Sequence, residues 1–201
     1  MKKTVIFLFS LLLCVSACKE SDGTDFDSGQ WRSYNETYFE EMYQAHKAAS
    51  TADCFVLSKW SLAEERDGIT PASTDCILVD VLQHGDEGGN MPEYTDSVMI
   101  HYSGHLLPSD DFPSGYEFDR SYLTTFDPVM DVPSRFYVGN LVPGMSTALQ
   151  HMRRGDHWIV TVPYQLGYGT TDRTNIPAYS TLFFEVYLVD FWQKDEGDRY
   201  Q

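Results

Sequence analysis

Leu141-Val142-Pro143-Gly144-Met145 begins a short segment with helical character. Proline is favoured in the first turn of a helix, where its missing N–H would have no partner anyway. Four apolar side chains then follow at the 0, 3, 4, 7 spacing of a buried helix face: Met145, Ala148, Leu149 and Met152. We therefore expect one short helix over 144–152, with this face packed into a core.

Strand patterns lie on both sides of this helix. Residues 182, 184, 186 and 188 are apolar and alternate with 181, 183, 185 and 187, which predicts a strand over 181–190. We also expect strands at 54–60, 76–82, 97–104 and 156–163. Many strands and few helices predict an α+β domain, and the chain is long enough for one core.

A second helix is predicted ahead of the strands, over 35–49. Ser33-Tyr34-Asn35-Glu36 has the spacing of a capping box. Large, mostly apolar side chains, with one histidine at the end, then recur at helical intervals: Tyr38, Phe39, Met42, Tyr43 and His46. This stripe must pack on the domain or on a second copy of the chain. We expect the domain, because four turns are short for a dimerisation arm.

The first residues have the layout of a targeting signal. Lys2 and Lys3 precede the apolar run Val5–Val15, and Val15-Ser16-Ala17-Cys18 places small residues before a cysteine. The pattern resembles a bacterial lipobox, which implies removal of residues 1–17 and lipidation of Cys18. The alternatives are a plain signal peptide or a membrane anchor, although the run is short for spanning a bilayer.

The segment after Cys18 is polar, and we expect 18–32 to be a flexible tether. Its Lys19, Glu20 and Asp22 resemble the signal that sends lipoproteins to the cell surface in Bacteroidota. The expected location is therefore the outer membrane, on its periplasmic face or at the cell surface.

The chain is strongly acidic, with a formal net charge of −16. Nucleic-acid phosphates require a basic surface, so we expect no nucleic-acid partner. An acidic protein must also be held to a membrane by its lipid alone, and several acyl chains on Cys18 would suffice.

Two cysteines remain after Cys14 and Cys18 are assigned to the leader and the lipid. Cys54 and Cys76 would lie in an oxidising compartment, so a disulfide between them is plausible. The alternative is two free thiols. We expect no metal site, since no cysteine pair has ligand spacing and His101 and His105 lie on a strand and its exit.

Four motifs follow one another in the second half of the chain. They are Ile100-His101-Tyr102-Ser103-Gly104, Glu117-Phe118-Asp119, Leu141–Met145, and Leu166-Gly167-Tyr168-Gly169 with Ile176-Pro177 and Ser180-Thr181-Leu182-Phe183-Phe184 after it. In this order they resemble FKBP-type peptidyl-prolyl isomerases, the macrolide-binding immunophilins. The resemblance covers 74–192. It implies a twisted antiparallel sheet curved around the 144–152 helix, with 33–73 as an N-terminal extension and 193–201 as a tail.

The resemblance also implies a pocket that needs no metal and no cofactor. Tyr102, Phe118 and Phe184 would form aromatic walls, while Asp119 organises the polar rim and Tyr168 donates a hydrogen bond to a ligand carbonyl. Leu141, Val142, Met145 and Ile176 would line the rest, with the Val142 N–H bonding a substrate carbonyl. Without the motif order, Phe184 would be ordinary sheet core, Tyr102 an edge aromatic, and Asp119 and Tyr168 turn and loop residues.

Several positions depart from the family pattern. Met145 stands where tryptophan is common, and methionine fills apolar gaps well. The connection from Gly104 to Phe118 is longer than in the minimal family member and contains Asp110-Asp111-Phe112-Pro113. The following connection, from Phe118 to Phe136, is also longer than in the minimal family member. Ser134 stands where the family has an aromatic residue, which Phe126 could replace.

The resulting expectation is a monomeric, membrane-anchored prolyl isomerase that acts on proline-containing clients and could bind macrolides. One rival function is a module of the same fold that binds proline-containing segments without useful turnover. Another is a structural lipoprotein that uses 33–73 as its contact. Asp119 and Tyr168 favour the enzyme, while the two longer connections and Ser134 favour the binding module.

Overall fold

A computed structural model describes residues 28–62, 70–122 and 131–192. The helices are α1 (Ser28–Ala49) and α2 (Pro143–Leu149), with short 3-10 turns η1 (Trp60–Leu62), η2 (Ser73–Asp75), η3 (Val138–Asn140) and η4 (Tyr164–Leu166). The strands are β1 (Cys54–Ser58), β2 (Cys76–Gln83), β3 (Ser97–Leu106), β4 (Glu117–Arg120), β5 (Ser134–Tyr137), β6 (His157–Val162) and β7 (Leu182–Trp192).

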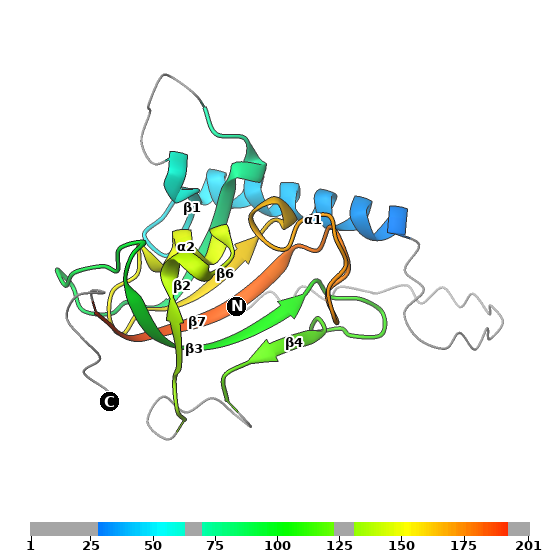
Figure 1. The fold of residues 1–201 in the computed structure, drawn as a ribbon. Helices are drawn as coiled ribbons and strands as arrows, with labels where there is room; N and C mark the ends of the chain where they lie inside the picture. The colour runs from blue at the N-terminus through cyan, green and yellow to red at the C-terminus, as the bar shows by residue number, and fades with distance from the viewer. Residues whose placement is uncertain (1–27, 63–69, 123–130, 193–201) are drawn as a thin grey trace, which may run out of the picture.

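The strands form one antiparallel sheet in the order β1-β2-β6-β7-β3-β4, and β5 also pairs with β3. Register shifts interrupt the β2–β6, β3–β4 and β3–β7 ladders, and such bulges increase bending and twist. Figure 1 shows the curved sheet with α2 against it. The predicted α+β class and the sheet curved around one short helix are therefore confirmed.

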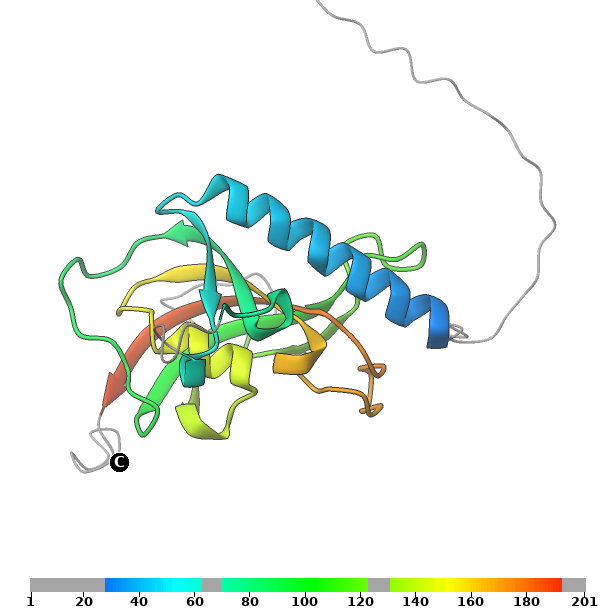
Figure 2. The ribbon, with the colours of Figure 1, turned by 90° about the horizontal axis from the view of Figure 1, so that it is seen from above.

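The two helices use opposite faces of β2. Ile77 and Val79 are fully buried in the main core with the α2 residues, whereas Leu78 packs with Phe39 and Tyr43 of α1. This division follows from the two-residue period of a strand. Figure 2 shows α1 running along the side of β1 and β2 away from α2. The expectation that the α1 stripe packs on its own domain is confirmed.

The start of α1 was predicted wrongly. The helix begins at Ser28, so Ser33 lies inside it and does not cap it, and residues 28–32 are helical instead of part of a flexible tether. The reason is tertiary docking by Trp31, whose ring is buried and whose Nε1 donates a 3.1 Å hydrogen bond to Ser180 Oγ.

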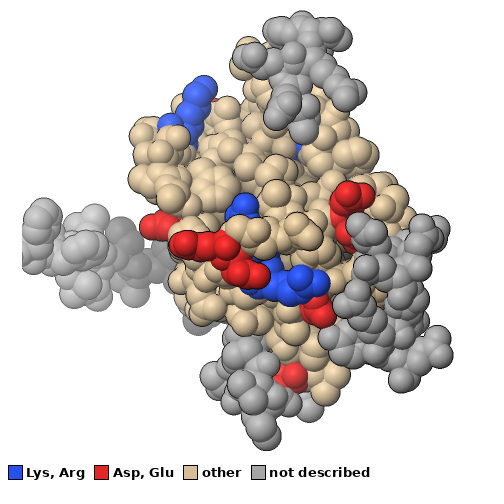
Figure 3. Space-filling view, turned by 90° about the vertical axis from the view of Figure 1, so that its left-hand side faces the viewer, with Lys and Arg blue, Asp and Glu red and all other residues tan. Residues whose placement is uncertain are grey.

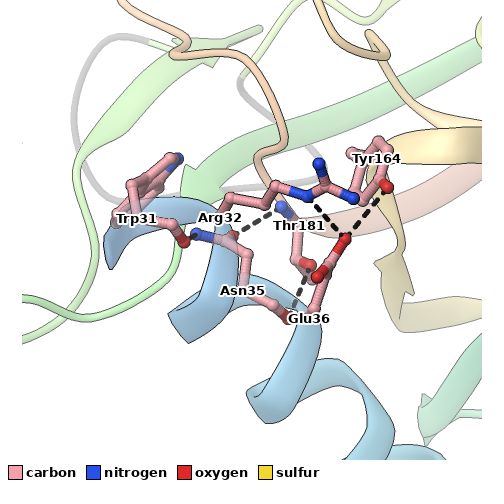
Figure 4. Close-up of polar contacts among 6 residues, drawn as sticks. All are labelled: Trp31, Arg32, Asn35, Glu36, Tyr164 and Thr181. Carbon is pink, nitrogen blue, oxygen red and sulfur yellow. Dashed lines mark hydrogen bonds and ion pairs between the residues drawn. The ribbon is translucent and has the colours of Figure 1, made fainter. Parts of the chain in front are cut away.

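A buried asparagine reinforces this docking (Figure 4). Asn35 Nδ2 donates to the Trp31 carbonyl at 2.8 Å, and Asn35 Oδ1 accepts the Thr181 N–H at 2.7 Å. On the exposed side, Glu36 accepts hydrogen bonds from Arg32 at 2.9 Å and from the Tyr164 hydroxyl at 3.1 Å. These contacts tie α1 to η4 and to the segment that enters β7.

The predicted disulfide is absent, because both Cys54 and Cys76 are free thiols. The strand register gives the reason: Cys54 pairs with Asp80 and Cys76 pairs with Ser58, at opposite ends of the β1–β2 ladder. Four residues along a strand span about 13 Å, which is beyond the roughly 7 Å between Cα atoms that a disulfide can bridge.

Charged side chains are unevenly distributed on the face shown in Figure 3. Acidic and basic groups lie next to one another in a narrow region, and much of the surrounding surface is uncharged. Some of the described arginines are paired, as in the contact of Arg154 with Asp190. The net negative charge therefore does not spread as a uniform acidic layer over this face.

Candidate active site

The sheet places three of the predicted aromatic side chains on the face that α2 covers. Tyr102 and Gly104 lie on β3 opposite Val186 and Phe184 of β7. Phe118 of β4 meets Phe184 edge to face, with ring centroids 5.7 Å apart. Edge-to-face contact is a favoured aromatic geometry, so these rings form a defined apolar wall.

Tyr102 and Asp119 form the polar rim beside this wall. The Tyr102 hydroxyl donates a 2.7 Å hydrogen bond to Asp119 Oδ2, and Asp119 Oδ1 accepts the Arg120 N–H at 2.9 Å. Both carboxylate oxygens are thus fixed although the residue is exposed. Tyr102 is also held edge to face by Phe136, with centroids 5.6 Å apart.

Tyr168 lies near the same carboxylate. Burial, and then the charge of Asp119, raise the pKa of Tyr168, and the guanidinium of Arg173 partly offsets this. Burial, and then the hydrogen bond and charge of Asp119, raise the pKa of Tyr102 well above its usual value. Both hydroxyls therefore stay protonated at neutral and mildly alkaline pH, and each keeps a proton to donate.

The remaining predicted residues belong to the main hydrophobic core, which also includes Tyr102 and Tyr168. Val142 is the N-cap of α2, and a residue there has no acceptor for its N–H within the helix. Met145 is buried one turn further on, and Ile176 is buried in a tight turn closed by reciprocal backbone hydrogen bonds with Arg173. All the apolar members of the predicted set belong to one hydrophobic cluster: Tyr102, Phe118, Leu141, Val142, Met145, Tyr168, Ile176 and Phe184.

A cavity of about 690 Å³ is lined in part by residues of this cluster and shares only Ile176 with the predicted set. Its walls come from the start of α1, the connection from β3 to β4 and the turn before Ile176, and include Trp31, Phe112, Tyr116 and Tyr179. Phe112 packs edge to face on Tyr116 at 5.0 Å. The longer β3–β4 connection therefore lines this cavity.

Two neighbours of the site were missed by sequence reasoning. Phe136 contacts Tyr102, and it lies two residues after the Ser134 that departs from the family pattern. Arg173 places its guanidinium 5.7 Å from the centre of the Tyr168 ring. The alternation of β5 could have indicated Phe136, whereas nothing local to Arg173 indicates its partner. Phe126 lies outside the described residues.

Replacing Gly104 with alanine tests the aromatic wall. A Cβ at this position would lie 2.6 Å from the Phe118 ring and 3.1 Å from Phe184, so the Phe118 ring must move. We expect catalysis to fall by roughly tenfold to a hundredfold, as misplacement of about 1 Å can cause, with little loss of thermal stability. Ser103→Ala, on the other face of β3, is the control. Equal turnover in both variants would contradict the assigned wall.

Comparison with known proteins identifies the family of the chain. Residues 88–189 match the family of FKBP-type peptidyl-prolyl cis-trans isomerases. The chain is 35% identical over 111 residues to the FKBP-type 22 kDa peptidyl-prolyl cis-trans isomerase of Escherichia coli K12, which covers 55% of this chain and 47% of that protein. It is 37% identical over 111 residues to the macrophage infectivity potentiator of Trypanosoma cruzi, covering 55% of this chain and 50% of that protein.

The fold is also similar to solved structures. The crystal structure of FkpA from Escherichia coli has a TM-score of 0.57 at 24% identity, covering 83% of this chain and 63% of that one. A peptidyl-prolyl cis-trans isomerase from Pseudomonas syringae pv. tomato has a TM-score of 0.56 at 23% identity, covering 85% and 100%. The chain belongs to the FKBP-type peptidyl-prolyl cis-trans isomerase family, and it spans about half the length of the curated relatives described above.

Proposed function

We propose that this chain is a peptidyl-prolyl cis-trans isomerase that assists the folding of exported proteins. The observation that carries the proposal is the Tyr102–Asp119 hydrogen bond of 2.7 Å beside the Phe118–Phe184 pair. This hydrogen bond fixes a polar rim next to an apolar aromatic wall. The family to which the chain belongs is named for prolyl isomerisation. Such a mostly apolar site with a few placed polar groups suits a proline ring and its flanking carbonyls.

Prolyl isomerisation requires only that the protein bind the twisted Xaa-Pro amide selectively. Rotation about an Xaa-Pro bond meets a barrier of about 18–20 kcal/mol, because twisting removes amide resonance. A site accelerates rotation when it binds the twisted amide more tightly than either planar form. Phe118 and Phe184 would hold the proline ring, while the Tyr168 hydroxyl and the Val142 N–H donate to carbonyl oxygens. Asp119 would keep the rim in position.

The proposal is tested by cis-to-trans isomerisation of short Leu-Pro and Phe-Pro peptides. We expect a chain that begins at Lys19 to accelerate the reaction. Asp119→Ala removes a charge-assisted hydrogen bond, worth about 1.5–3 kcal/mol, so activity should fall at least tenfold. Tyr168→Phe removes a neutral donor, worth about 0.5–1.5 kcal/mol, so activity should fall by about two- to tenfold.

Matched controls are available nearby. Asp111→Ala removes an exposed carboxylate from the β3–β4 connection, and Tyr164→Phe removes a hydroxyl that donates to Glu36. Both should retain native activity. A folded native chain that gives no acceleration would overturn the enzyme proposal, and activity losses in the controls as large as in Asp119→Ala would overturn the assigned site.

The neighbouring cavity supports a second candidate, a binding or chaperone module for proline-containing segments. At about 690 Å³ the cavity is large enough for several side chains, and the β3–β4 connection that departs from the family pattern lines it. Suppression of client aggregation that survives Asp119→Ala and is lost on replacing Phe112 would favour this candidate. Under the isomerase proposal, macrolides would bind at the Phe118–Phe184 wall and not in this cavity.

We further propose that the chain is lipidated at Cys18 and held at the bacterial outer membrane as a monomer. Support comes from the sequence pattern before Cys18, which lies outside the described residues. Over residues 28–62, 70–122 and 131–192, no helix has the length and apolar character needed to cross a bilayer. Mass spectrometry of membrane-extracted protein tests the lipid, and Cys18→Ala should release the chain from membranes.

A further inference from the structure

Three side chains with metal-binding atoms meet on the α1 side of the sheet. His46 comes from the last turn of α1, Cys54 from the first residue of β1, and Asp80 from the neighbouring position on β2. One ligand atom from each lies within 4.8 Å of the other two. Although the three residues are separated in sequence, the β1–β2 register brings Cys54 and Asp80 side by side and α1 places His46 over them.

His46 is oriented as a metal ligand usually is. Its side chain is 8% exposed, its Nδ1 lies 2.9 Å from the Met42 carbonyl oxygen, and its Nε2 lies 3.1 Å from Asp80 Oδ2. A carbonyl partner on one ring nitrogen fixes the tautomer and leaves the other nitrogen as the ligand. The same arrangement argues against a nucleophilic Cys-His-Asp triad, because the Nδ1 that would bridge to a second catalytic group is bonded to the backbone.

We propose that His46, Cys54 and Asp80 form a binding site for a divalent transition-metal ion of the zinc class, with its fourth position open to water. One nitrogen, one sulfur and one oxygen ligand suit this borderline-soft ion. The proposal is independent of prolyl isomerisation, and the sequence did not reveal the site because its ligands share no local spacing.

The distances between the three ligand atoms allow them to coordinate one metal ion after small side-chain movements. Zinc bonds of about 2.0–2.3 Å in tetrahedral geometry require ligand atoms roughly 3.3–3.8 Å apart. The His46–Asp80 separation of 3.1 Å is already near this range, and no pair exceeds 4.8 Å. Asp80 has a 39% exposed side chain, so water can reach the fourth position.

The surroundings favour a cation over the empty cluster. The site lies at the C-terminal end of α1, where the helix dipole is negative. Asp80 also places a carboxylate beside the His46 and Cys54 ligand atoms, which adds to the attraction for a cation. Bound metal would tie the end of α1 to β1 and β2, whereas the Trp31 and Asn35 contacts hold the start of the helix.

Cobalt(II) titration of the chelator-treated purified protein tests the proposal. We expect one equivalent of cobalt to produce thiolate-to-cobalt charge-transfer absorption and the intense visible bands of a four-coordinate ion, and zinc to abolish both. Zinc at about a hundred times its dissociation constant should raise the melting temperature by roughly 5–10 °C.

Matched variants assign the signal to this cluster. Cys54→Ala should abolish the charge-transfer band, and His46→Gln or Asp80→Asn should weaken cobalt binding at least tenfold. Cys76→Ala removes the other described free thiol, and His84→Gln removes the exposed histidine that contacts Asp53 at 2.7 Å; both should bind cobalt normally. A folded protein without the thiolate band, or a band lost in Cys76→Ala and kept in Cys54→Ala, would overturn the site.

Discussion

Phe184→Ala is expected to lower the free energy of unfolding by about 3–5 kcal/mol and to remove most isomerase activity. The side chain is 5% exposed, lies at the centre of the sheet on β7, and packs edge to face against Phe118. Truncating a buried phenylalanine loses its transfer free energy and leaves a cavity, which together give a cost of this size. Chemical denaturation and the peptide assay measure the two effects.

Phe183→Ala is the matched control for Phe184→Ala. Its ring is half-buried on the other face of the same strand, where it contacts Tyr38 of α1 with centroids 6.3 Å apart. We expect a smaller loss of about 1–2 kcal/mol, from partial apolar burial and one aromatic contact, with turnover retained below the melting transition. If both variants lose activity equally, the wall assigned to Phe184 is not the part of β7 that binds substrate.

The same strand shows what the sequence could predict. Alternation of apolar side chains is a local property, so it identified β7 and the buried face that carries Phe184. The positions of Met145, Ala148 and Leu149 identified α2 for the same reason, since helix spacing is also local. The order of four motifs then related Tyr102, Asp119 and Tyr168 to one site, although they are far apart in the chain.

Other features depend on contacts that no local pattern contains. The Cys54–Cys76 pairing was wrong because the β1–β2 register, which is set by the whole sheet, places Cys54 beside Asp80. The first turn of α1 was missed because its polar sequence favours a tether, whereas burial of Trp31 against Ser180 stabilises a helix there. The cavity lined by Phe112 and Tyr179 also needs three distant segments together.

Gly144→Ala is expected to destabilise the protein by about 1–3 kcal/mol, although alanine favours helices. A Cβ at Gly144 would lie 2.4 Å from Val162 Cγ1 and 2.9 Å from its Cγ2. Val162 is fully buried and its branched side chain has few alternative rotamers. The overpacking cost of about 1–3 kcal/mol therefore exceeds the gain in helix propensity, which is at most about 1 kcal/mol. Because α2 must move away from β6, Val142 and Met145 move with it, and activity should fall as well.

Val162→Ala provides the test of this contact. Val162→Ala alone leaves a cavity and should also destabilise the protein, but in the double variant the alanine at 144 occupies the space that the valine methyl groups vacate. The double variant should therefore be more stable than the sum of the two single changes predicts, with a coupling of about 1–3 kcal/mol in denaturant unfolding. If the two losses in free energy of unfolding simply add, the cost at Gly144 arises within α2 itself. If Gly144→Ala is instead more stable than the native protein, α2 lies further from β6 than this contact requires.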